Sequence, residues 1–572
     1  MTDTAALNLL WCDQLMDGLA AAGVRRVVIS PGSRSTPLVL ALNRQPRIQS
    51  WRHPDERSAA FFALGLASHD HQPVALIATS GSAPGHWLPA VIEANRSGIP
   101  LILLSADRPA ELQTCGSNQT VDQIHLFGSQ VRGYYDAGSP SVLPEALTHI
   151  RRLGVQAVHR ACGPEPGPVH INLPLPEPLT PQSFPPPPRS GPPVVVARNR
   201  IAPDPPQLRR IVQLINIGNG LIVCGPMPPD EAFASAVTHL AGELACPLLA
   251  DPLSGLRFGG HNHSQVISNY DGFLRADAFN TGQSPDWVLR FGAAPVSKAL
   301  LDYLARSGAQ TILCAPHGDW PDPLHQTTEM VRSDPSLFCA ALSEHALRSG
   351  QTTWRQRFTL AEQAVDRFRL PAQEIPTEDR LIEELLVQLP AHAILFSGNS
   401  LPIRQLDSWS GQRDMPLRIH ANRGASGIDG NVSTLLGLAA ACEHPVVGLL
   451  GDLTFFHDMN GLLFARGLRA VIILFNNNGG GIFGTLPQAG LETFEQQWLM
   501  PTHVDFRHTA RLYDLNYQRI EQQRQFRPAL AKALANPGVD LIEIMLQRER
   551  SLARQLAYVQ QLKTIVDQTL LT

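Results

Sequence analysis

The sequence has few of the features that mark exported, membrane-spanning or nucleic-acid-binding proteins. Its eight cysteines are scattered and none forms a C-x-x-C pair, which favours small buried thiols in a reducing compartment over a metal site or disulfides. No apolar run reaches 18 residues, and no basic segment opens the chain. Lysine and arginine (46) nearly balance aspartate and glutamate (50), without a basic block. We therefore expect a cytoplasmic protein with no membrane insertion and no nucleic-acid partner.

The chain is too long for one domain. Its 572 residues suggest three or four domains, at about 150 residues for each. A proline-rich stretch at 173–206 cannot continue a helix or a central strand and predicts a stiff linker. A second break falls at 370–380, where Thr377 is placed to cap a helix. These breaks predict domains at 1–180, 200–370 and 375–572.

Each predicted domain alternates short apolar runs with longer helical patterns. One run from each domain is RRVVIS (25–30), GLIVCGP (220–226) and PVVGLLGD (445–452). Such runs, separated by helices, predict an α/β fold in which each domain is a mostly parallel sheet flanked by helices. Ligands of these sheets bind at the carboxyl ends of the strands, so the loops that follow the runs are where a site is expected.

Residues 64–107 resemble residues 436–479 at a constant offset of 372 with no gap. LGLASHDHQPVALIATSG then lies on LGLAAACEHPVVGLLGDL, with matched positions that include Gly65 and Gly437. Identities are few beyond the first stretch, but helix, strand, helix and strand agree in one register. We infer a duplicated α/β unit, so the first and third domains are related and the middle domain is a third sheet of similar kind.

A motif for a metal ion and a diphosphate follows two strands of the third domain. Asp452 ends one apolar run and Asn477 ends the next, so both should emerge at the same edge of neighbouring strands. A carboxylate, an amide oxygen and the carbonyl of Gly479 are the hard ligands that Mg²⁺ prefers. The amides around Gly451 and Gly480 are placed to bind phosphate. The alternative is that Asp452 only caps the next helix and NNNGG is a polar turn.

The spacing of this motif resembles the signature of thiamine-diphosphate enzymes. A competing pattern overlaps it, because Gly479, Gly481 and Gly484 spell G-x-G-x-x-G, the dinucleotide fingerprint. Pro487 interrupts the helix that should follow, and no acidic residue ends an obvious further strand. An NAD- or FAD-dependent oxidoreductase is therefore the weaker interpretation.

Thiamine catalysis needs a glutamate that shares a proton with the aminopyrimidine ring, and Glu56 is the candidate. Glu56 begins the duplicated helix of the first domain, where an acidic residue also simply favours a helix N-terminus. Under the offset of 372, Glu56 falls on Ile428, in a loop next to the metal motif of the third domain. We expect Ile428 to wedge the bent cofactor, and burial to raise the pKa of Glu56.

Four of the predicted strand-end loops carry an arginine. Each arginine alone is better explained as a surface or structural residue. Four on converging loops indicate a substrate with several carboxylates, because guanidinium binds carboxylate bidentately. They are Arg34, Arg108, Arg404 and Arg423.

The chain as a whole resembles the 2-succinyl-5-enolpyruvyl-6-hydroxy-3-cyclohexene-1-carboxylate synthases of menaquinone and phylloquinone biosynthesis. The resemblance rests on SPGSRSTPL, DERSAAFFALGLA, TSGSA, SADRP, the SNQT–DQ segment, GNSLPIR, NRGASGIDG, GDLTFFHD and NNNGGGIF. It implies thiamine diphosphate with Mg²⁺, or Mn²⁺ in its place, decarboxylation of 2-oxoglutarate, and 1,4-addition of the succinyl carbanion to isochorismate.

The resemblance also implies roles for individual residues. Glu56, Arg34 and Gln119 match catalytic positions, and Leu453 and Ile482 join the cofactor-binding set. Lys298 matches a substrate-binding lysine, although Ala299 stands where a second basic residue is expected. The full set of implied substrate contacts is Ser33, Arg34, Arg108, Gln119, Lys298, Ser400, Arg404, Arg423, Ile482, Phe483 and Leu486.

Two other hypotheses remain open from the sequence. One is a different thiamine-dependent decarboxylase or carboligase, which would not need so many arginines. The other is a cofactor-binding regulatory or structural protein without catalysis, which the presence of both Glu56 and Asp452 argues against. In the favoured interpretation the protein is a homodimer or homotetramer with active sites at subunit interfaces.

Overall fold

A computed structural model of the chain describes residues 3–188, 192, 194 and 199–571. The chain forms two compact units, and each is described by itself. The first unit contains residues 1–199, 422–443 and 454–469, and the second contains residues 200–421, 444–453 and 470–572. Three six-stranded parallel sheets make up these units, one in the first and two in the second.

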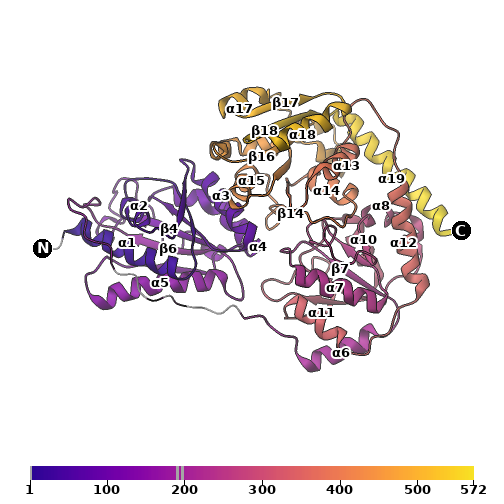
Figure 1. The fold of residues 1–572 in the computed structure, drawn as a ribbon, viewed down its shortest axis with the longest axis horizontal. Helices are drawn as coiled ribbons and strands as arrows, with labels where there is room; N and C mark the ends of the chain where they lie inside the picture. Colours follow the sequence, from indigo (N-terminus) through magenta and orange to yellow (C-terminus); the bar gives the residue numbers. More distant parts are fainter. Residues whose placement is uncertain (1–2, 189–191, 193, 195–198, 572) are drawn as a thin grey trace. The chain divides into compact units, whose positions relative to one another are not determined.

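The first sheet has the strand order β2-β1-β3-β4-β6-β5. Its strands are β1 (Arg26–Ile29), β2 (Gln49–Arg52), β3 (Val74–Ala78), β4 (Leu101–Asp107), β5 (Gly133–Asp136) and β6 (Val169–Pro174). Apolar side chains of α1 (Thr4–Ala21), α2 (Thr36–Asn43) and α5 (Pro144–Cys162) form a core with one face of this sheet, along which α1 and α5 lie side by side (Figure 1). The other helices of the unit are α3 (Glu56–Asp70), α4 (Leu88–Ser97) and α15 (Asn431–Ala441), with short turns η1 (Pro84–Trp87), η2 (Ala110–Leu112), η3 (Gly128–Gln130) and η4 (Met459–Ala465).

The third sheet of the chain has the order β14-β13-β15-β16-β18-β17, which is the order of the first sheet strand for strand. Its strands are β13 (Ile394–Ser397), β14 (Arg418–His420), β15 (Val446–Gly451), β16 (Ala470–Asn476), β17 (Asn516–Ile520) and β18 (Val539–Met545). Helices α13 (Glu378–Gln388), α14 (Leu401–Trp409) and α18 (Phe526–Ala535) cover one face. Also present are α16 (Asp452–His457), α17 (Phe506–Leu512) and the short helices η5 (Gly481–Thr485), η6 (Pro487–Gly490), η7 (Glu495–Leu499) and η8 (Gln523–Gln525).

The middle sheet differs in strand order, β12-β11-β10-β7-β8-β9. It is parallel like the others, but it is not a third copy of the duplicated arrangement. Its strands are β7 (Gly220–Cys224), β8 (Leu248–Ala250), β9 (Val266–Ile267), β10 (Trp287–Phe291), β11 (Gln310–Cys314) and β12 (Thr327–Val331). Its helices are α6 (Pro205–Ile215), α7 (Glu231–Leu244), α8 (Tyr270–Phe273), α9 (Asp277–Thr281), α10 (Lys298–Ser307), α11 (Pro335–Ser343) and α12 (Thr352–Arg367). The last helix of the chain, α19 (Arg548–Leu571), returns to pack beside α12 (Figure 1).

The duplicated helices α3 and α15 cross in the first unit at a pair of matched glycines. A Cβ on Gly65 would meet Thr434 O at 2.1 Å, and a Cβ on Gly437 would meet Phe62 O at 2.2 Å. The two contacts exchange under the predicted offset, so the crossing is symmetric. The offset also holds from β3 to β15, but the following connection is three residues shorter in the third sheet, so the prediction of an ungapped register is wrong for β16.

The two predicted breaks in the chain have different outcomes. Part of the 173–206 linker (189–191, 193 and 195–198) lies outside the described residues, and the described residues between β6 and α6 contain neither helix nor strand. Thr377 is the N-cap of α13 as predicted, but its side chain makes no capping bond to the helix amides. Among the described helices, none combines the length and the apolar character that crossing a bilayer requires.

Candidate functional site

The predicted metal motif lies in the second unit, at the carboxyl edge of neighbouring strands β15 and β16. Gly451 pairs with Phe475 at the ends of these strands, so Asp452 and the turn 476–480 follow side by side. Asp452 is buried, and its Oδ2 accepts a hydrogen bond from Gly479 N at 2.7 Å while its Oδ1 accepts from Leu453 N at 2.8 Å. Burial raises the pKa of Asp452 to about 6, against the backbone hydrogen bonds that favour the carboxylate.

Asn477 and Gly479 have the properties that the proposed ligands need. The Oδ1 atom of Asn477 is buried and has no hydrogen-bond partner among the described residues. Gly479 has φ 127°, and a Cβ there would meet Leu499 O at 2.1 Å, so only glycine fits this turn. A buried carboxylate, an orphaned amide oxygen and an adjacent glycine carbonyl form a donor set that fits a hard divalent cation. Within the described part of the chain, no group of three or more His, Cys, Asp or Glu side chains is placed to hold a metal.

Side chains that the sequence does not point to support this turn. Glu543, on β18, accepts a hydrogen bond from Asn476 Nδ2 at 2.6 Å and another from the Tyr517 hydroxyl. Asn478 has a positive φ of 57°, and its Oδ1 accepts from His503 N at 3.1 Å. Glu543 lies in β18, which is buried along almost its whole length, but a lone acidic residue in an apolar strand does not reveal its distant partners, so these contacts could not be found from sequence patterns.

A small cavity of about 20 Å³ lies behind Asn477 and is lined by α14, α19 and η5. Gln405 Oε1 and Trp409 Nε1, one helical turn apart on α14, line it and have no partner among the described residues. The buried carboxyl of Glu378 also faces it. A polar cavity of this size has room for one water molecule.

Helix α14 presents two of the predicted substrate residues in the second unit. Ser400 is the N-cap, with φ 73° and ψ −125°, a backbone conformation that is strained for any residue except glycine. Arg404 is exposed and donates from Nη1 to Ser400 O at 2.6 Å, so its guanidinium lies at the helix start. Lys298, at the start of α10, is exposed and pairs with Asp302 at 2.9 Å.

The predicted apolar wall follows the metal turn. Ile482 and Phe483 are half-buried in η5, and Leu486 is 40% exposed. The last two glycines of the G-x-G-x-x-G pattern lie in η5, and η6 follows instead of an α-helix, so the pattern does not form a dinucleotide-binding turn.

In the first unit, three of the predicted residues meet at the carboxyl edge of the sheet. Arg108 donates from Nη1 to Gln119 O at 2.6 Å, and Gln119 Nε2 donates to Ser80 O at 3.0 Å. Arg34 is buried and donates to Leu175 O at 2.8 Å and to Glu177 Oε1 at 2.7 Å. Burial and the nearby charge of Arg34 lower the pKa of Arg108. Ser33 is exposed directly before Arg34.

A buried network that centres on Asn172 holds this edge together. Asn172 Nδ2 donates to Asp107 Oδ2 at 2.8 Å, and its Oδ1 accepts from Ser105 Oγ and Gln123 Nε2, both at 2.8 Å. Asp107 also accepts from Arg108 N at 2.7 Å. The network positions the loops that carry Arg108 and Gln119, and only the dense polar spacing of the segment 105–123 could have suggested it.

The remaining predicted residues of the first unit lie on two segments. Glu56 is half-buried at the first position of α3, next to Asp55, which caps the helix through the amides of Arg57 and Ser58. Arg423 and Ile428 are half-buried in the loop that leads into α15.

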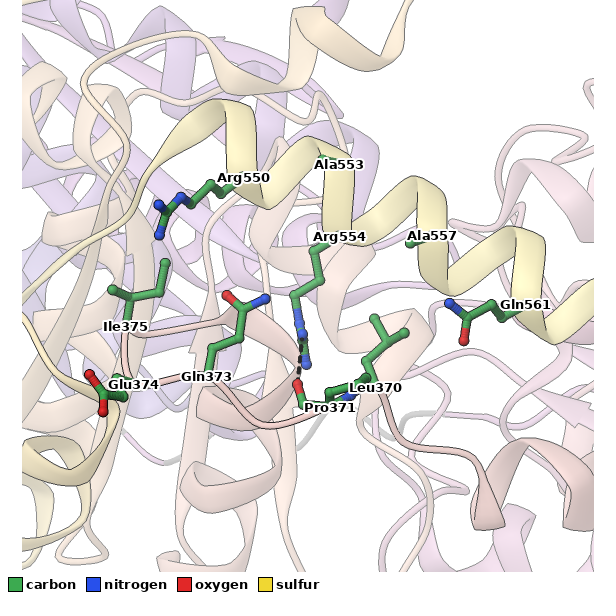
Figure 2. Close-up of a pocket in the computed structure, with 10 residues that line it drawn as sticks. All are labelled: Leu370, Pro371, Gln373, Glu374, Ile375, Arg550, Ala553, Arg554, Ala557 and Gln561. Atoms are coloured by element: carbon green, nitrogen blue, oxygen red, sulfur yellow. Dashed lines mark hydrogen bonds between the residues drawn. The ribbon is translucent and has the colours of Figure 1, made fainter.

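A larger cavity, of about 670 Å³, lies in the second unit between α19 and the segment 370–375 (Figure 2). Arg554 at its wall donates to Pro371 O at 3.0 Å and pairs with Asp379 at 2.7 Å (the bond to Pro371 is drawn in Figure 2). None of the predicted site residues lines this cavity, so it is separate from the metal motif.

Comparison with known families matches three successive segments of the chain. Residues 12–126 match the N-terminal binding domain of thiamine pyrophosphate enzymes, residues 198–397 match their middle domain, and residues 406–544 match their C-terminal binding domain. The outer two matches cover β1–β4 of the first sheet and β14–β17 of the third, the two sheets that have the same strand order.

Individual relatives resemble the chain over nearly its full length. The 2-succinyl-5-enolpyruvyl-6-hydroxy-3-cyclohexene-1-carboxylate synthase of Dechloromonas aromatica is 45% identical, over 95% of this chain and 99% of the relative. Proteins of the same name from Haloarcula marismortui (94% of this chain, 95% of the relative) and Geobacillus kaustophilus (93% and 94%) are 41% and 42% identical. Among solved structures, benzoylformate decarboxylase from Polynucleobacter necessarius has a TM-score of 0.71 over 94% of this chain and 98% of that one, at 17% identity, a likeness of fold alone.

Proposed function

Because the chain belongs to the 2-succinyl-5-enolpyruvyl-6-hydroxy-3-cyclohexene-1-carboxylate synthase family of thiamine pyrophosphate enzymes, we propose that it decarboxylates 2-oxoglutarate and adds the succinyl unit to isochorismate. The observation that carries the proposal is identity of 45% over 95% of the chain to a relative of that name. The product would serve menaquinone or phylloquinone formation in the cytoplasm.

The metal turn is where the cofactor's diphosphate would bind. Asp452 Oδ, Asn477 Oδ1 and the Gly479 carbonyl would hold Mg²⁺, or Mn²⁺ in its place, and the amides near Gly451 and Gly480 would bind phosphate oxygens. Leu453 and Ile482 flank this turn and would contact the cofactor. When bound, thiamine diphosphate supplies a carbanion that attacks a 2-oxo acid and accepts the electron pair released with CO₂.

Glu56 would hold the proton that activates the cofactor, and Ile428 would keep the cofactor bent. Glu56 is the first residue of α3 and is half-buried, and its carboxyl would exchange a proton with the bound ring. In the proposed homodimer or homotetramer, Glu56 of one subunit would complete the site that contains Asp452 of another. Light scattering on purified protein would measure the number of subunits in the assembly. The domain limits 1–180, 200–370 and 375–572 belong to the same proposal.

The arginines would bind the carboxylates of the two substrates. The positive charge of Arg34 contributes to lowering the pKa of Arg108, and a bound dicarboxylate would neutralise both guanidinium groups. Gln119, held against Arg108, would orient the reacting group. The other proposed contacts are Ser33, Lys298, Ser400, Arg404 and Arg423, with Ile482, Phe483 and Leu486 as the apolar wall.

One assay tests the proposal. Purified protein is incubated with Mg²⁺, thiamine diphosphate and 2-oxoglutarate, with and without isochorismate, and CO₂ release and the condensed product are followed. We expect product and CO₂ in equal amounts that depend on isochorismate. Release of CO₂ from pyruvate, with no dependence on isochorismate, would instead indicate a different decarboxylase of the same fold.

A further inference from the structure

The loop that carries Arg423 and Ile428 is fastened to helix α4 by one buried carboxylate. Glu93 is 3% exposed, and its two oxygens accept hydrogen bonds from two consecutive backbone amides, Gly424 N and Ala425 N, each at 2.7 Å. Ser97, one helical turn further along α4, donates to Glu93 Oε1 at 2.6 Å. All of these groups belong to the first unit.

The contact leaves little freedom at this point of the loop. A Cβ on Gly424 would meet Ser97 Oγ at 2.5 Å and Glu93 O at 2.7 Å, so the loop backbone lies directly on α4. Three donors converge on one carboxylate, and hydrogen bonds to a charged acceptor are roughly twice as strong as neutral ones. Ala425 is exposed, and its amide donates to Glu93 Oε2.

The far end of the loop is fixed separately. Asn431, the first residue of α15, donates from Nδ2 to Asp429 O at 2.8 Å and to Gly427 O at 3.2 Å. Ile428 lies between these two acceptors, and Arg423 directly precedes the amides that Glu93 binds. The loop is therefore held at two places, and the first of them belongs to a helix of the N-terminal sheet.

We propose that Glu93 is a positioning residue, which fixes the loop 423–428 so that Arg423 and Ile428 are held ready for substrate and cofactor. Glu93 touches neither ligand and acts only through the loop. The proposal rests on the proposed function for the roles of Arg423 and Ile428, but the fastening of the loop is independent of it.

The test compares Glu93→Gln with wild type by hydrogen–deuterium exchange of the full chain without substrates. Glutamine has nearly the same shape, but it can accept a hydrogen bond from only one of the two backbone amides and turns an N–H₂ group towards the other. We expect exchange in a peptide that covers 422–429 to become about tenfold faster, because a charge-assisted hydrogen bond is lost. Glu145→Gln, an exposed acid on α5 of the same unit, is the matched control and should leave this peptide unchanged.

The second readout separates positioning from general stability. In Glu93→Gln we expect KM for 2-oxoglutarate and Kd for thiamine diphosphate to rise about tenfold each, with a smaller change in kcat, because loop ordering must then accompany binding. Faster exchange with unchanged KM and Kd would overturn the positioning role. Unchanged exchange would overturn the fastening itself. If wild type does not act on 2-oxoglutarate, the proposed function fails. Hydrogen exchange of the loop and the Kd for thiamine diphosphate still decide whether Glu93 is a positioning residue.

Ser97→Ala covers the case in which Glu93→Gln does not fold. This variant removes one donor to Glu93 and keeps both amide contacts, so we expect a smaller acceleration of exchange in the same peptide. Exchange of the Gly424 and Ala425 amides in wild type at the rate of an unstructured peptide would overturn the proposal without any variant.

Discussion

At the scale of single residues, Asp452 is distinguished by accepting two backbone amides while it remains buried. Asp452→Asn keeps its shape but removes the charge that would face the cation. We expect the apparent affinity for Mg²⁺, measured by metal-dependent thiamine diphosphate binding, to fall about 100-fold or more. Asp514→Asn makes the same change at an exposed residue with φ 57°. This variant should bind Mg²⁺ and thiamine diphosphate as wild type does. Equal Mg²⁺ affinity in the two variants would remove Asp452 from the ligand set.

Glu56 is expected to affect turnover rather than binding. Glu56→Gln keeps the length of the side chain but cannot give or take the proton. We expect kcat to fall about 10²- to 10⁴-fold while Kd for thiamine diphosphate changes little. Stopped activity together with lost cofactor binding would indicate a structural role at the start of α3, and unchanged kcat would remove the catalytic role.

His170 gives the first unit a defined sensitivity to acid. Its Nε2 lies 2.7 Å from Ser105 Oγ, and since that hydroxyl donates to Asn172, the ring donates to the hydroxyl. Burial lowers the pKa of His170 to about 3, so the ring stays neutral in the fold, whereas the unfolded chain binds a proton near pH 6.5. The folded pKa is the lower of the two, so stability is lost as pH falls below 6.5.

The loss should be about 1.4 kcal/mol for each pH unit between 6.5 and 3, or about 2 kcal/mol at pH 5. Urea unfolding at pH 7 and at pH 5, monitored by hydrogen exchange of peptides from β6, measures this loss of stability. In His170→Gln the free energies of unfolding at pH 7 and pH 5 should differ by less than they do in wild type. An identical pH dependence in the variant would show that another group is responsible.

Residue types and spacing could predict the metal motif because its members directly follow apolar strands. The sequence predicts that Asp452, Asn477 and Gly479 lie together, and the structure places Asp452 against the turn that contains the other two, while their role as metal ligands stays a prediction. Glu93, Asn172 and Glu543 could not be predicted, because each binds a partner that is distant in the chain. The spacing of residues around a lone polar residue in a helix or strand does not identify such a partner.

At the scale of elements, the crossing of α3 and α15 depends on backbone contact rather than on side chains. Gly65→Ala would place a Cβ 2.1 Å from Thr434 O, a backbone atom that cannot turn aside as the end of a side chain can. We expect a loss of about 2–4 kcal/mol and a lower Tm for the first unit. Gly242→Ala on α7 is the matched control, since nothing lies within 4 Å of its new Cβ. It should be neutral or slightly stabilising, and a similar loss in both variants would disprove the steric argument.

Elements were more predictable than their register. The apolar runs identify β1, β7 and β15 because parallel strands covered on both faces contain almost no polar residues. The three-residue difference before β16 cannot be predicted from apolar spacing, because helix α16 and turn η4 replace a regular helix there and spacing does not reveal a shortened connection.

At the scale of the whole molecule, the two sheets of the second unit share a buried ion pair. Arg257 is fully buried and donates from Nη2 to Asp407 Oδ1 at 2.6 Å, from Nη1 to Ser410 Oγ at 2.9 Å, and from Nε to Ala250 O at 2.7 Å. Asp407 lies on α14, the helix that begins at Ser400. The middle sheet therefore helps to hold a helix of the proposed substrate site.

Asp407→Asn would leave the Arg257 charge buried without its partner. We expect a loss of about 3–5 kcal/mol, with the middle and third sheets losing stability together. Differential scanning calorimetry, with exchange of peptides from β8 and α14, would measure this. Glu549→Gln, which changes an exposed carboxyl paired with Arg548, should cost less than about 1 kcal/mol. Unfolding of β8 at its wild-type temperature in Asp407→Asn would show that the sheets are not coupled by this pair.

The shortened connection before β16 has a consequence for how the two copies of the duplicated unit diverged. Once it is taken into account, Asp452 corresponds to Ser80 and Asn477 corresponds to Arg108. The same two corners of the duplicated sheet thus carry the proposed anion-binding residue in one copy and the proposed cation ligands in the other. Exchanging a few side chains at those corners, with the strands untouched, would be the shortest route by which such a duplicated scaffold acquires new ligands.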